Sequence, residues 1–414
     1  MNQKIIFVIV YVTLFCCTGG SKSKALTNVL LQAEIIDTLI IPKDAVPIVY
    51  LNHIYIPSKV ESISGNFVFD TGADGLYLDS TFYANNSFRK FKFAKAMLPG
   101  GGTSGPQAVM IIRDTISFTF QNYSNNLSYI PIPVLKPILG DFADGMLGWQ
   151  PFSDKILEIN YFHEYIRLHN DINVIDTSDY VKISMKKERN RFYVPATIQI
   201  NEAVSIQDYV TLDIGANASI LITSVTANKY NFSDIIVDKV YRYNKYGGIS
   251  GQTSLYSFRV PSIKIGDFKL DSITVAYSED SSGAASSQNY YTGLLGNKIL
   301  ERFDVIIDFM NNDLYLKPNS NYDKPFNFSK LGFTYVDRSI TMNAWIVTGL
   351  YKNSKAEIAG LKHDDKIISI NGINIHQISN KEQTVFFEKI DKVALVVLRN
   401  NEEKIIEFDL KHVL

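Results

Sequence analysis

The sequence predicts a mainly β protein with two similar lobes, followed by a small α+β domain. Three observations support this prediction. Apolar and polar residues alternate over short stretches such as 46–56 and 192–200, which lie between Gly, Asn and Ser turns, and few segments before residue 320 have helical periodicity. One set of motifs occurs twice in the same order. After Leu316 the chain becomes polar and proline-bounded, which marks a linker.

The repeat begins with an aspartate at a sharp turn. Residues 67–78 carry an apolar approach, Asp-Thr-Gly-Ala and an apolar exit, and residues 210–222 repeat this pattern with Asp-Ile-Gly-Ala. Glycine-rich stretches follow at 98–106 and 247–253, then Gly-x-Leu-Gly at 145–148 and 293–296, then matching apolar stretches at 159–168 and 307–316. The copies stay about 145 residues apart throughout, which indicates a duplicated lobe.

The aspartates of the two turns are the candidate functional residues. An apolar strand delivers Asp70 to the turn, Thr71 can hydrogen-bond locally, and Gly72 lets the backbone bend. Asp213 occupies the matching place in the second copy. A single Asp-Thr-Gly is also an ordinary turn sequence, so the second copy carries the argument.

This ordered set of motifs resembles the lobe of a pepsin-like or retroviral-type aspartic protease over about residues 46–317. The Asp-Thr-Gly-Ala form and the short lobes are closer to the retroviral type, here with two lobes fused in one chain. The resemblance implies an aspartic-type endopeptidase that needs no metal and no cofactor, with a peptide or protein as substrate. It implies that Asp70 and Asp213 are catalytic, and that four residues support their turns: Thr71, Gly72, Ile214 and Gly215.

The glycine-rich stretches have two interpretations. As isolated motifs they are surface hairpin tips, where glycine supplies positive φ angles. The resemblance implies that they are flaps closing over bound peptide, with these candidates: Gly101, Gly102, Ser104, Gly247, Gly248 and Ser250. A phosphate-binding loop is excluded because no Gly-Lys-Ser/Thr follows.

Ile214 departs from the resembling family, which usually has Thr or Ser there. In that fold the hydroxyl reaches the backbone of the other lobe, and an isoleucine cannot make this hydrogen bond, which is worth about 0.5 to 1.5 kcal/mol. The departure supports a competing hypothesis, a catalytically inactive peptide-binding protein with the protease fold. Because both Asp and both Gly persist, we favour the enzyme.

Other kinds of site are excluded by composition and spacing. The net charge is −1 and no basic patch stands out, which argues against a nucleic-acid partner. His163-Glu164 has Arg167 where a zinc-binding helix needs its second histidine, and the six histidines are scattered, which suggests surface or core positions. The two cysteines lie at 16 and 17, outside the predicted folded part.

Residues 1–17 are predicted to be a signal peptide, because a lysine precedes an apolar run that is too short to span a membrane. We therefore expect an exported protein, in the periplasm or at the cell surface. Residues 14–17 resemble a bacterial lipoprotein cleavage site, although Phe15 is bulkier than usual. The sequence leaves open whether Cys16 or Cys17 carries a lipid, the one membrane anchor expected.

The last part of the chain carries the features of another domain. Residues 354–361 predict a short helix with a Ser start and a Gly stop, and 364–372 predict a strand running into an Asn-Gly turn. These motifs resemble a bacterial protease-associated PDZ domain, which implies peptide binding at Leu331, Gly332 and Phe333. A packing module that binds nothing is the alternative. The predicted domains are lobe one at 26–172, lobe two at 173–318 and the PDZ domain at 326–414.

Overall fold

The structure is a computed structural model that describes residues 41–414, except 101, 250, 284–285 and 287–290. Residues 41–414 form one compact unit. The predicted signal peptide and residues 26–40 of the predicted first lobe lie outside the described residues. Within the described part of the chain, no helix is long and apolar enough to cross a bilayer.

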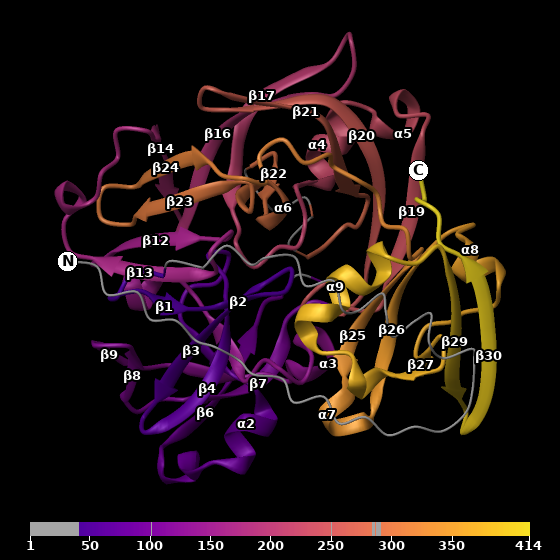
Figure 1. Ribbon diagram of the computed structural model, residues 1–414. Coiled ribbons are helices and arrows are strands. Elements are labelled where there is room, and N and C mark those ends of the chain that lie inside the picture. Colours follow the sequence, from indigo (N-terminus) through magenta and orange to yellow (C-terminus); the bar gives the residue numbers. More distant parts are fainter. Residues whose placement is uncertain (1–40, 101, 250, 284–285, 287–290) are drawn as a thin grey trace, which may run out of the picture. The chain divides into compact units, whose positions relative to one another are not determined.

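The first lobe contains two β-sheets whose strands are mostly antiparallel (Figure 1). The larger runs in the order β5-β11-β4-β3-β8-β9, with β2 added to β3. Its strands are β2 (Val49–Tyr50), β3 (Ile54–Val60), β4 (Ile63–Phe69), β5 (Leu76–Leu78), β8 (Ile116–Phe120), β9 (Tyr123–Leu127) and β11 (Gly145–Leu147). The smaller sheet contains β6 (Phe93–Leu98), β7 (Gln107–Ile112) and β10 (Ile130–Ile132). Two short helices accompany them, α2 (Ser80–Asn85) and α3 (Lys136–Leu139).

The second lobe repeats this plan. Its strands are β15 (Lys186–Glu188), β16 (Arg191–Gln199), β17 (Ser205–Leu212), β18 (Ile220–Ile222), β19 (Lys239–Asn244), β20 (Thr253–Ile265), β21 (Phe268–Ser278) and β22 (Gly293–Leu295). Its helices are α4 (Ser224–Lys229), α5 (Phe232–Ile235) and α6 (Asn297–Leu300). In lobe one β11 pairs parallel with β4 and antiparallel with β5, and in lobe two β22 pairs in the same way with β17 and β18. The predicted duplication is confirmed.

A six-stranded sheet is shared by the two lobes, in the order β1-β13-β12-β23-β24-β14. Its strands are β1 (Val46–Pro47), β12 (Ile156–Asn160), β13 (Tyr165–His169), β14 (Val181–Ser184), β23 (Phe303–Asp308) and β24 (Asp313–Pro318). The duplicated hairpins meet at its centre, where Ile159 pairs with Val305. Both side chains are fully buried, so the sheet and the lobes share one apolar core.

The C-terminal domain has its own core, built around the fully buried Trp345. Its strands are β25 (Phe333–Arg338), β26 (Ala344–Tyr351), β27 (Lys366–Ile370), β28 (Ile373–Asn374), β29 (Lys392–Arg399) and β30 (Glu402–Asp409), with helices α7 (Ser339–Met342), α8 (Lys355–Ile358) and α9 (Asn380–Glu388). The predicted helix is confirmed as α8, since the side chain of Ser354 caps Glu357 N. The predicted Asn-Gly turn is confirmed at Asn371 and Gly372, which both have positive φ.

The C-terminal domain is less separate than its linker suggested. Strand β19 of lobe two pairs with β26, with Arg242 opposite Tyr351, so one sheet continues from lobe two into this domain. The linker is fastened to lobe two, because the Arg302 guanidinium donates to the carbonyls of Asn321 and Tyr322 at 3.0 Å each. A polar, proline-bounded composition predicts a linker but says nothing about backbone pairing between distant strands.

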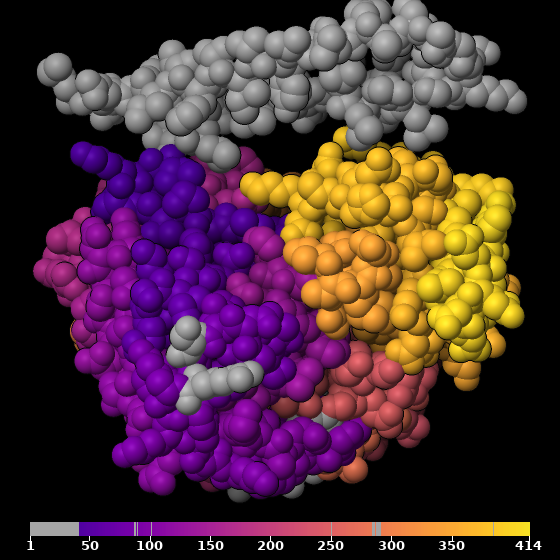
Figure 2. All heavy atoms as spheres, turned by 90° about the horizontal axis from the view of Figure 1, so that it is seen from below, coloured from indigo at the N-terminus to yellow at the C-terminus, as the bar shows by residue number. Residues whose placement is uncertain are grey.

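Lobe one also contacts the C-terminal domain. Asp141, just after α3, accepts hydrogen bonds from Arg338 Nε at 2.7 Å and from Thr341 N at 2.7 Å. Figure 2 shows the indigo-to-purple first lobe beside the orange-to-yellow C-terminal domain. The Asp141 carboxylate is almost fully buried and paired with arginine, so this contact is held by a charge-assisted hydrogen bond.

Candidate active site

The two predicted aspartates lie at equivalent ends of equivalent strands. Asp70 follows β4, and its N–H donates to Leu147 O of β11 at 2.9 Å. Asp213 follows β17, and its N–H donates to Leu295 O of β22 at 2.9 Å. The leucine of each Gly-x-Leu-Gly motif therefore accepts a backbone hydrogen bond from the aspartate of its own lobe.

Each carboxyl group packs against the glycine of the other turn. A Cβ on Gly215 would lie 2.3 Å from Cγ of Asp70, and a Cβ on Gly72 would lie 2.9 Å from Cγ of Asp213. Gly72 N also donates to Asp70 Oδ1 at 2.7 Å. Any larger residue at either glycine would displace a carboxyl group, so close approach explains why both turns keep glycine. The structure brings both aspartates into one site.

The pKa values of both aspartates are raised. Burial raises the pKa of Asp70, while hydrogen bonding with Asp213 and with the turn N–H groups opposes the rise. Burial raises the pKa of Asp213 well above its ordinary value, and the charge of Asp70 and their mutual hydrogen bond raise it further. Two carboxyl groups that hydrogen-bond to each other cannot both ionise readily, so the pair shares one proton.

Thr71 connects the turns of the two lobes. Its buried hydroxyl donates to Leu212 O at 2.7 Å and accepts from Ile214 N at 3.0 Å. The side chain of Ile214 is fully buried and offers no hydroxyl in return. Ile214 therefore contributes its backbone N–H to the connection, which is made by one hydroxyl group from lobe one.

Asn297 is a supporting residue that the sequence analysis missed. Its Nδ2 donates to Ile214 O at 2.5 Å, its backbone N–H donates to Ala216 O at 2.9 Å, and its Oδ1 accepts from Tyr161 OH at 2.8 Å. The side chain is fully buried and thus bonds the second turn to the shared sheet. The sequence signal that could have identified Asn297 is its position directly after the Gly-Leu-Leu-Gly motif.

Arg191 and Asp74 form an ion pair at one end of the site, which the sequence analysis also missed. Arg191 starts β16 of lobe two, and its guanidinium donates to the carboxylate of Asp74, four residues after Asp70. Its positive charge lowers the pKa values of both Asp70 and Asp213. Arg191 thereby opposes the effect of burial on the pair.

His53 lies against the second aspartate turn. Burial lowers its pKa to about 4, although a hydrogen bond with the backbone of Gly215 opposes this change. Its Nδ1 is buried and has no hydrogen-bond partner in the described part of the chain. The scattered histidines suggested only surface or core positions, whereas the structure places His53 against the second aspartate turn.

The two glycine-rich stretches contact each other. They form the tips of the hairpins β6–β7 and β19–β20. Thr103 N donates to Gln252 O at 3.0 Å, and a Cβ on Gly247 would lie 3.4 Å from Cα of Gly102. The other described candidates, Ser104 and Gly248, lie in the same tips, while Gly101 and Ser250 lie outside the described residues.

A cavity of about 800 Å³ adjoins this site and reaches the C-terminal domain. Its lining includes His53 and Asn217 next to the second turn, and Leu331 and Phe333 of the predicted peptide-binding loop. Gly332, between them, has a φ of 70°. No cluster of His, Cys, Asp and Glu with metal-binding geometry occurs among the residues that the structure describes.

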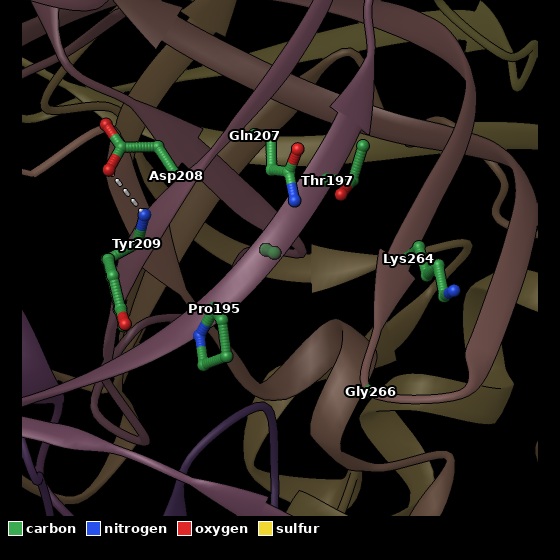
Figure 3. A pocket seen from close by; sticks show the side chains of 8 residues that line it. Pro195, Thr197, Gln207, Asp208, Tyr209, Lys264 and Gly266 are labelled. Carbon is green, nitrogen blue, oxygen red and sulfur yellow. Dashed lines mark hydrogen bonds between the residues drawn. The ribbon is translucent and has the colours of Figure 1, made fainter.

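A smaller cavity of about 460 Å³ lies on β16 and β17 (Figure 3). Asp208 and Tyr209 line it, and Asp208 accepts from Tyr209 N at 2.8 Å and from Thr292 Oγ1 at 2.7 Å. Neither Asp70 nor Asp213 lines this cavity. We therefore assign it no part in the chemistry.

Residues 346–385 match the PDZ domain family model. Among solved structures, the aspartic proteinase from Irpex lacteus is similar at 13% identity and a TM-score of 0.42, over 68% of this chain and 99% of that chain. No curated protein matched the sequence. The chain thus carries a PDZ domain at its C-terminal end, which confirms that part of the sequence prediction.

Proposed function

We propose that this protein is an aspartic endopeptidase, in which Asp70 and Asp213 together activate a water molecule for attack on a peptide bond. The observation that carries the proposal is the reciprocal packing of each carboxyl group against the glycine of the opposite turn. Burying a carboxyl group costs free energy, so two aspartates that served only as turn residues would be expected at the surface and not together in a buried site.

The raised pKa values suit a division of roles between the two acids. The ionised member takes a proton from water as the water attacks the peptide carbonyl carbon. The protonated member donates a hydrogen bond to the developing oxyanion. The pair shares one proton, so the acid that holds it before attack acts as the donor and the other acid acts as the base. The proton held by the pair belongs to both acids in any titration.

The hairpin tips fit the covering of an extended peptide. Both tips carry glycine, and they contact each other through Thr103 and Gln252. A peptide would enter the site after these contacts open, and their closure would exclude water from the reacting bond. The flap role of the described glycines is part of the proposal.

A catalytically inactive peptide-binding protein is the second candidate, and Ile214 favours it. The missing hydroxyl leaves one residue, Thr71, to hold the two turns together. Asn297 favours the enzyme, because it fixes the backbone of the second turn through Ile214 O and Ala216 O. Because Thr71 and Asn297 both hydrogen-bond to the backbone of the second turn, Asp213 is held in place although Ile214 has no hydroxyl.

The PDZ domain and the N-terminal segment extend the proposal to partner and place. PDZ domains bind extended peptides by adding a strand to a sheet edge, so we propose a peptide ligand for β25 and α9. Residues 1–17 lead us to propose export to the periplasm or cell surface, with a lipid on Cys16 or Cys17 as the route to a membrane.

The function is tested by incubating the purified chain with a diverse peptide mixture and identifying new termini by mass spectrometry. Asp70→Asn removes one member of the pair, and Asp234→Asn in the exposed part of α5 is the matched control. We expect cleavage by the native chain and by Asp234→Asn, and none by Asp70→Asn. Peptide binding without any cleavage by the native chain would favour the inactive binding protein.

A further inference from the structure

The large cavity is lined by the strand and the helix that form the expected peptide groove of the PDZ domain. Strand β25 contributes residues 333–337, and α9 contributes Asn380, Gln383 and Phe387. The opposite wall comes from the two lobes, including Gly140 of lobe one and Val275 of lobe two. A ligand in this groove would therefore touch lobe residues as well as the PDZ domain.

The groove along β25 is open at the Phe333 end and is closed at the Asp337 end by lobe one. Among the described residues, β25 pairs with one strand, β26, so its second edge faces the cavity. At the far end of this edge Asp141 N donates to Asp337 O at 2.9 Å. The backbone from Phe333 to Val336 is left for an incoming strand, which is the requirement for strand addition.

Arg242 of lobe two lies beside the open end. It stands opposite Tyr351 in the β19–β26 pairing, and its Nη1 donates to Tyr351 OH at 3.0 Å. The N–H of Tyr351 in turn donates to Gly332 O at 3.0 Å, in the predicted peptide-binding loop. Arg242 lines the same cavity as Leu331 and Phe333.

The charge of Arg242 has no counter-ion in the described part of the chain. Its Nε is buried and has no hydrogen-bond partner, and no carboxylate among the described residues lies within ion-pair distance. Three of the four acids that line the cavity have other partners: Asp141 binds Arg338, Asp337 binds Gln383, and Glu301 binds Tyr50 and Lys298. The fourth, Glu388 at the end of α9, is exposed and forms no ion pair with Arg242 among the described contacts. A half-buried guanidinium without an anion is costly, and an anionic ligand would remove that cost.

We propose that Arg242 of the second lobe completes the carboxylate site of the PDZ groove. The ligand is the C-terminal end of an extended peptide, which adds a strand to β25 and places its free carboxylate between the 331–333 loop and the Arg242 guanidinium. The planar guanidinium can bind a carboxylate through two parallel hydrogen bonds. This inference rests on the proposed peptide binding by the PDZ domain and adds a binding residue from outside that domain.

The test measures peptide binding by the full chain carrying Asp70→Asn, which prevents cleavage of the probe. The probe is a fluorescein-labelled decapeptide pool with Val, Ile, Leu or Phe at the last position and a free carboxylate, and the amidated pool is its control. Fluorescence anisotropy is measured for the Arg242→Gln and Arg242→Lys variants and for Lys239→Gln. Lys239 lies in the same strand, binds Ser233 O and does not line the cavity.

We expect Arg242→Gln to weaken binding of the carboxylate pool about tenfold to a hundredfold, to the level of the amidated pool. Arg242→Lys should bind between native and Arg242→Gln, because it keeps the charge and loses the paired geometry. Lys239→Gln should bind like the native chain. Circular dichroism of each variant checks that the sheet is intact.

Two outcomes overturn parts of the proposal separately. If Arg242→Gln still prefers the carboxylate pool as strongly as the native chain, Arg242 has no part in the site, although peptide binding by the PDZ domain stands. If the native chain does not distinguish the two pools, the groove takes no carboxylate at all. Cleavage by the native chain, measured separately, decides the protease function in either case.

Discussion

The hydroxyl of Thr71 and the backbone N–H of Ile214 are joined by a 3.0 Å hydrogen bond that crosses from one lobe to the other. The same hydroxyl donates to Leu212 O at 2.7 Å, so a single side chain serves both a donor and an acceptor of the second lobe. Both hydrogen bonds use the hydroxyl of Thr71, because Ile214 has no side-chain hydroxyl that could bond to the backbone of lobe one. The arrangement makes Thr71 the critical residue between the two aspartate turns.

Replacing Thr71 by Val should destabilise the protein by roughly 1–3 kcal/mol, because it leaves a buried N–H and a buried carbonyl without a partner. Urea denaturation followed by circular dichroism measures this change. Thr71→Ser keeps the hydroxyl and serves as the control, with a smaller loss expected from its missing methyl group. Equal stability of the Val variant and the native chain would show that the hydroxyl does not hold the lobes together.

Replacing Arg191 by Gln should raise the apparent pKa values of the aspartate pair. The positive charge of Arg191 lowers the pKa of both acids, so its loss leaves burial less opposed. The limbs of the kcat/KM profile against pH should both move to higher pH, since they report the pKa values of the free enzyme. Arg113→Gln, at an exposed position, is the control. A profile that moves to lower pH would contradict the assigned effect of Arg191.

Introducing serine at both Ala73 and Ala216 should have the opposite effect on the pair. In pepsin-like proteins a hydroxyl at this position donates to a catalytic carboxylate and stabilises its charged form, which lowers its pKa. The alanines of this chain therefore predict a pH optimum in the mildly acidic range. The pH profile of Ala73→Ser with Ala216→Ser should shift downward. A strongly acidic optimum in the native chain, or an upward shift in the variant, would be inconsistent with this explanation.

His53 should make the native protein sensitive to acid. Its folded-state pKa of about 4 lies below its ordinary value of 6.5, so the folded state resists taking up the proton that the unfolded state accepts. The stability that depends on neutral His53 is present above pH 6.5 and is lost as the pH falls toward 4. His53→Gln removes this dependence and keeps an N–H donor for the Gly215 backbone.

The measurement is the melting temperature of native, His53→Gln and His376→Gln protein between pH 8 and pH 4. His376 is exposed and controls for the loss of an imidazole. We expect His53→Gln to gain stability relative to the native chain below pH 6.5, with no pH-dependent gain in His376→Gln. A difference in melting temperature between the native and His53→Gln proteins that stays constant with pH would show that His53 does not titrate in this range.

The fold and the aspartate pair could be predicted because their signals are local and repeated. Asp70 and Asp213 sit in matching turns, and the motifs that follow them recur at nearly constant spacing. The glycines of these turns are required by the close approach of the opposite carboxyl group, whereas the sequence indicated only that glycine lets the backbone bend there. A duplicated motif set specifies a duplicated lobe before any single strand can be assigned.

The rest of the site could not be predicted because its contacts join segments far apart in the chain. Arg191 meets Asp74 across 117 positions, and nothing near either residue in sequence indicates the other. Strands β3 and β4 lie between His53 and Asp70 in the sequence, yet His53 contacts the turn that carries Asp213. The pairing of β19 with β26 is likewise set by edge strands of two different domains, whose contact no local periodicity encodes.

The central claim is that Asp70 and Asp213 act as one catalytic unit, and comparison of single and double variants tests it most directly. The kcat/KM of one cleaved peptide is measured for Asp70→Asn, Asp213→Asn and the double variant. Because the pair shares one water and one proton, each single substitution should abolish cleavage about as fully as both together. Substantial activity in either single variant would contradict a site built from both aspartates.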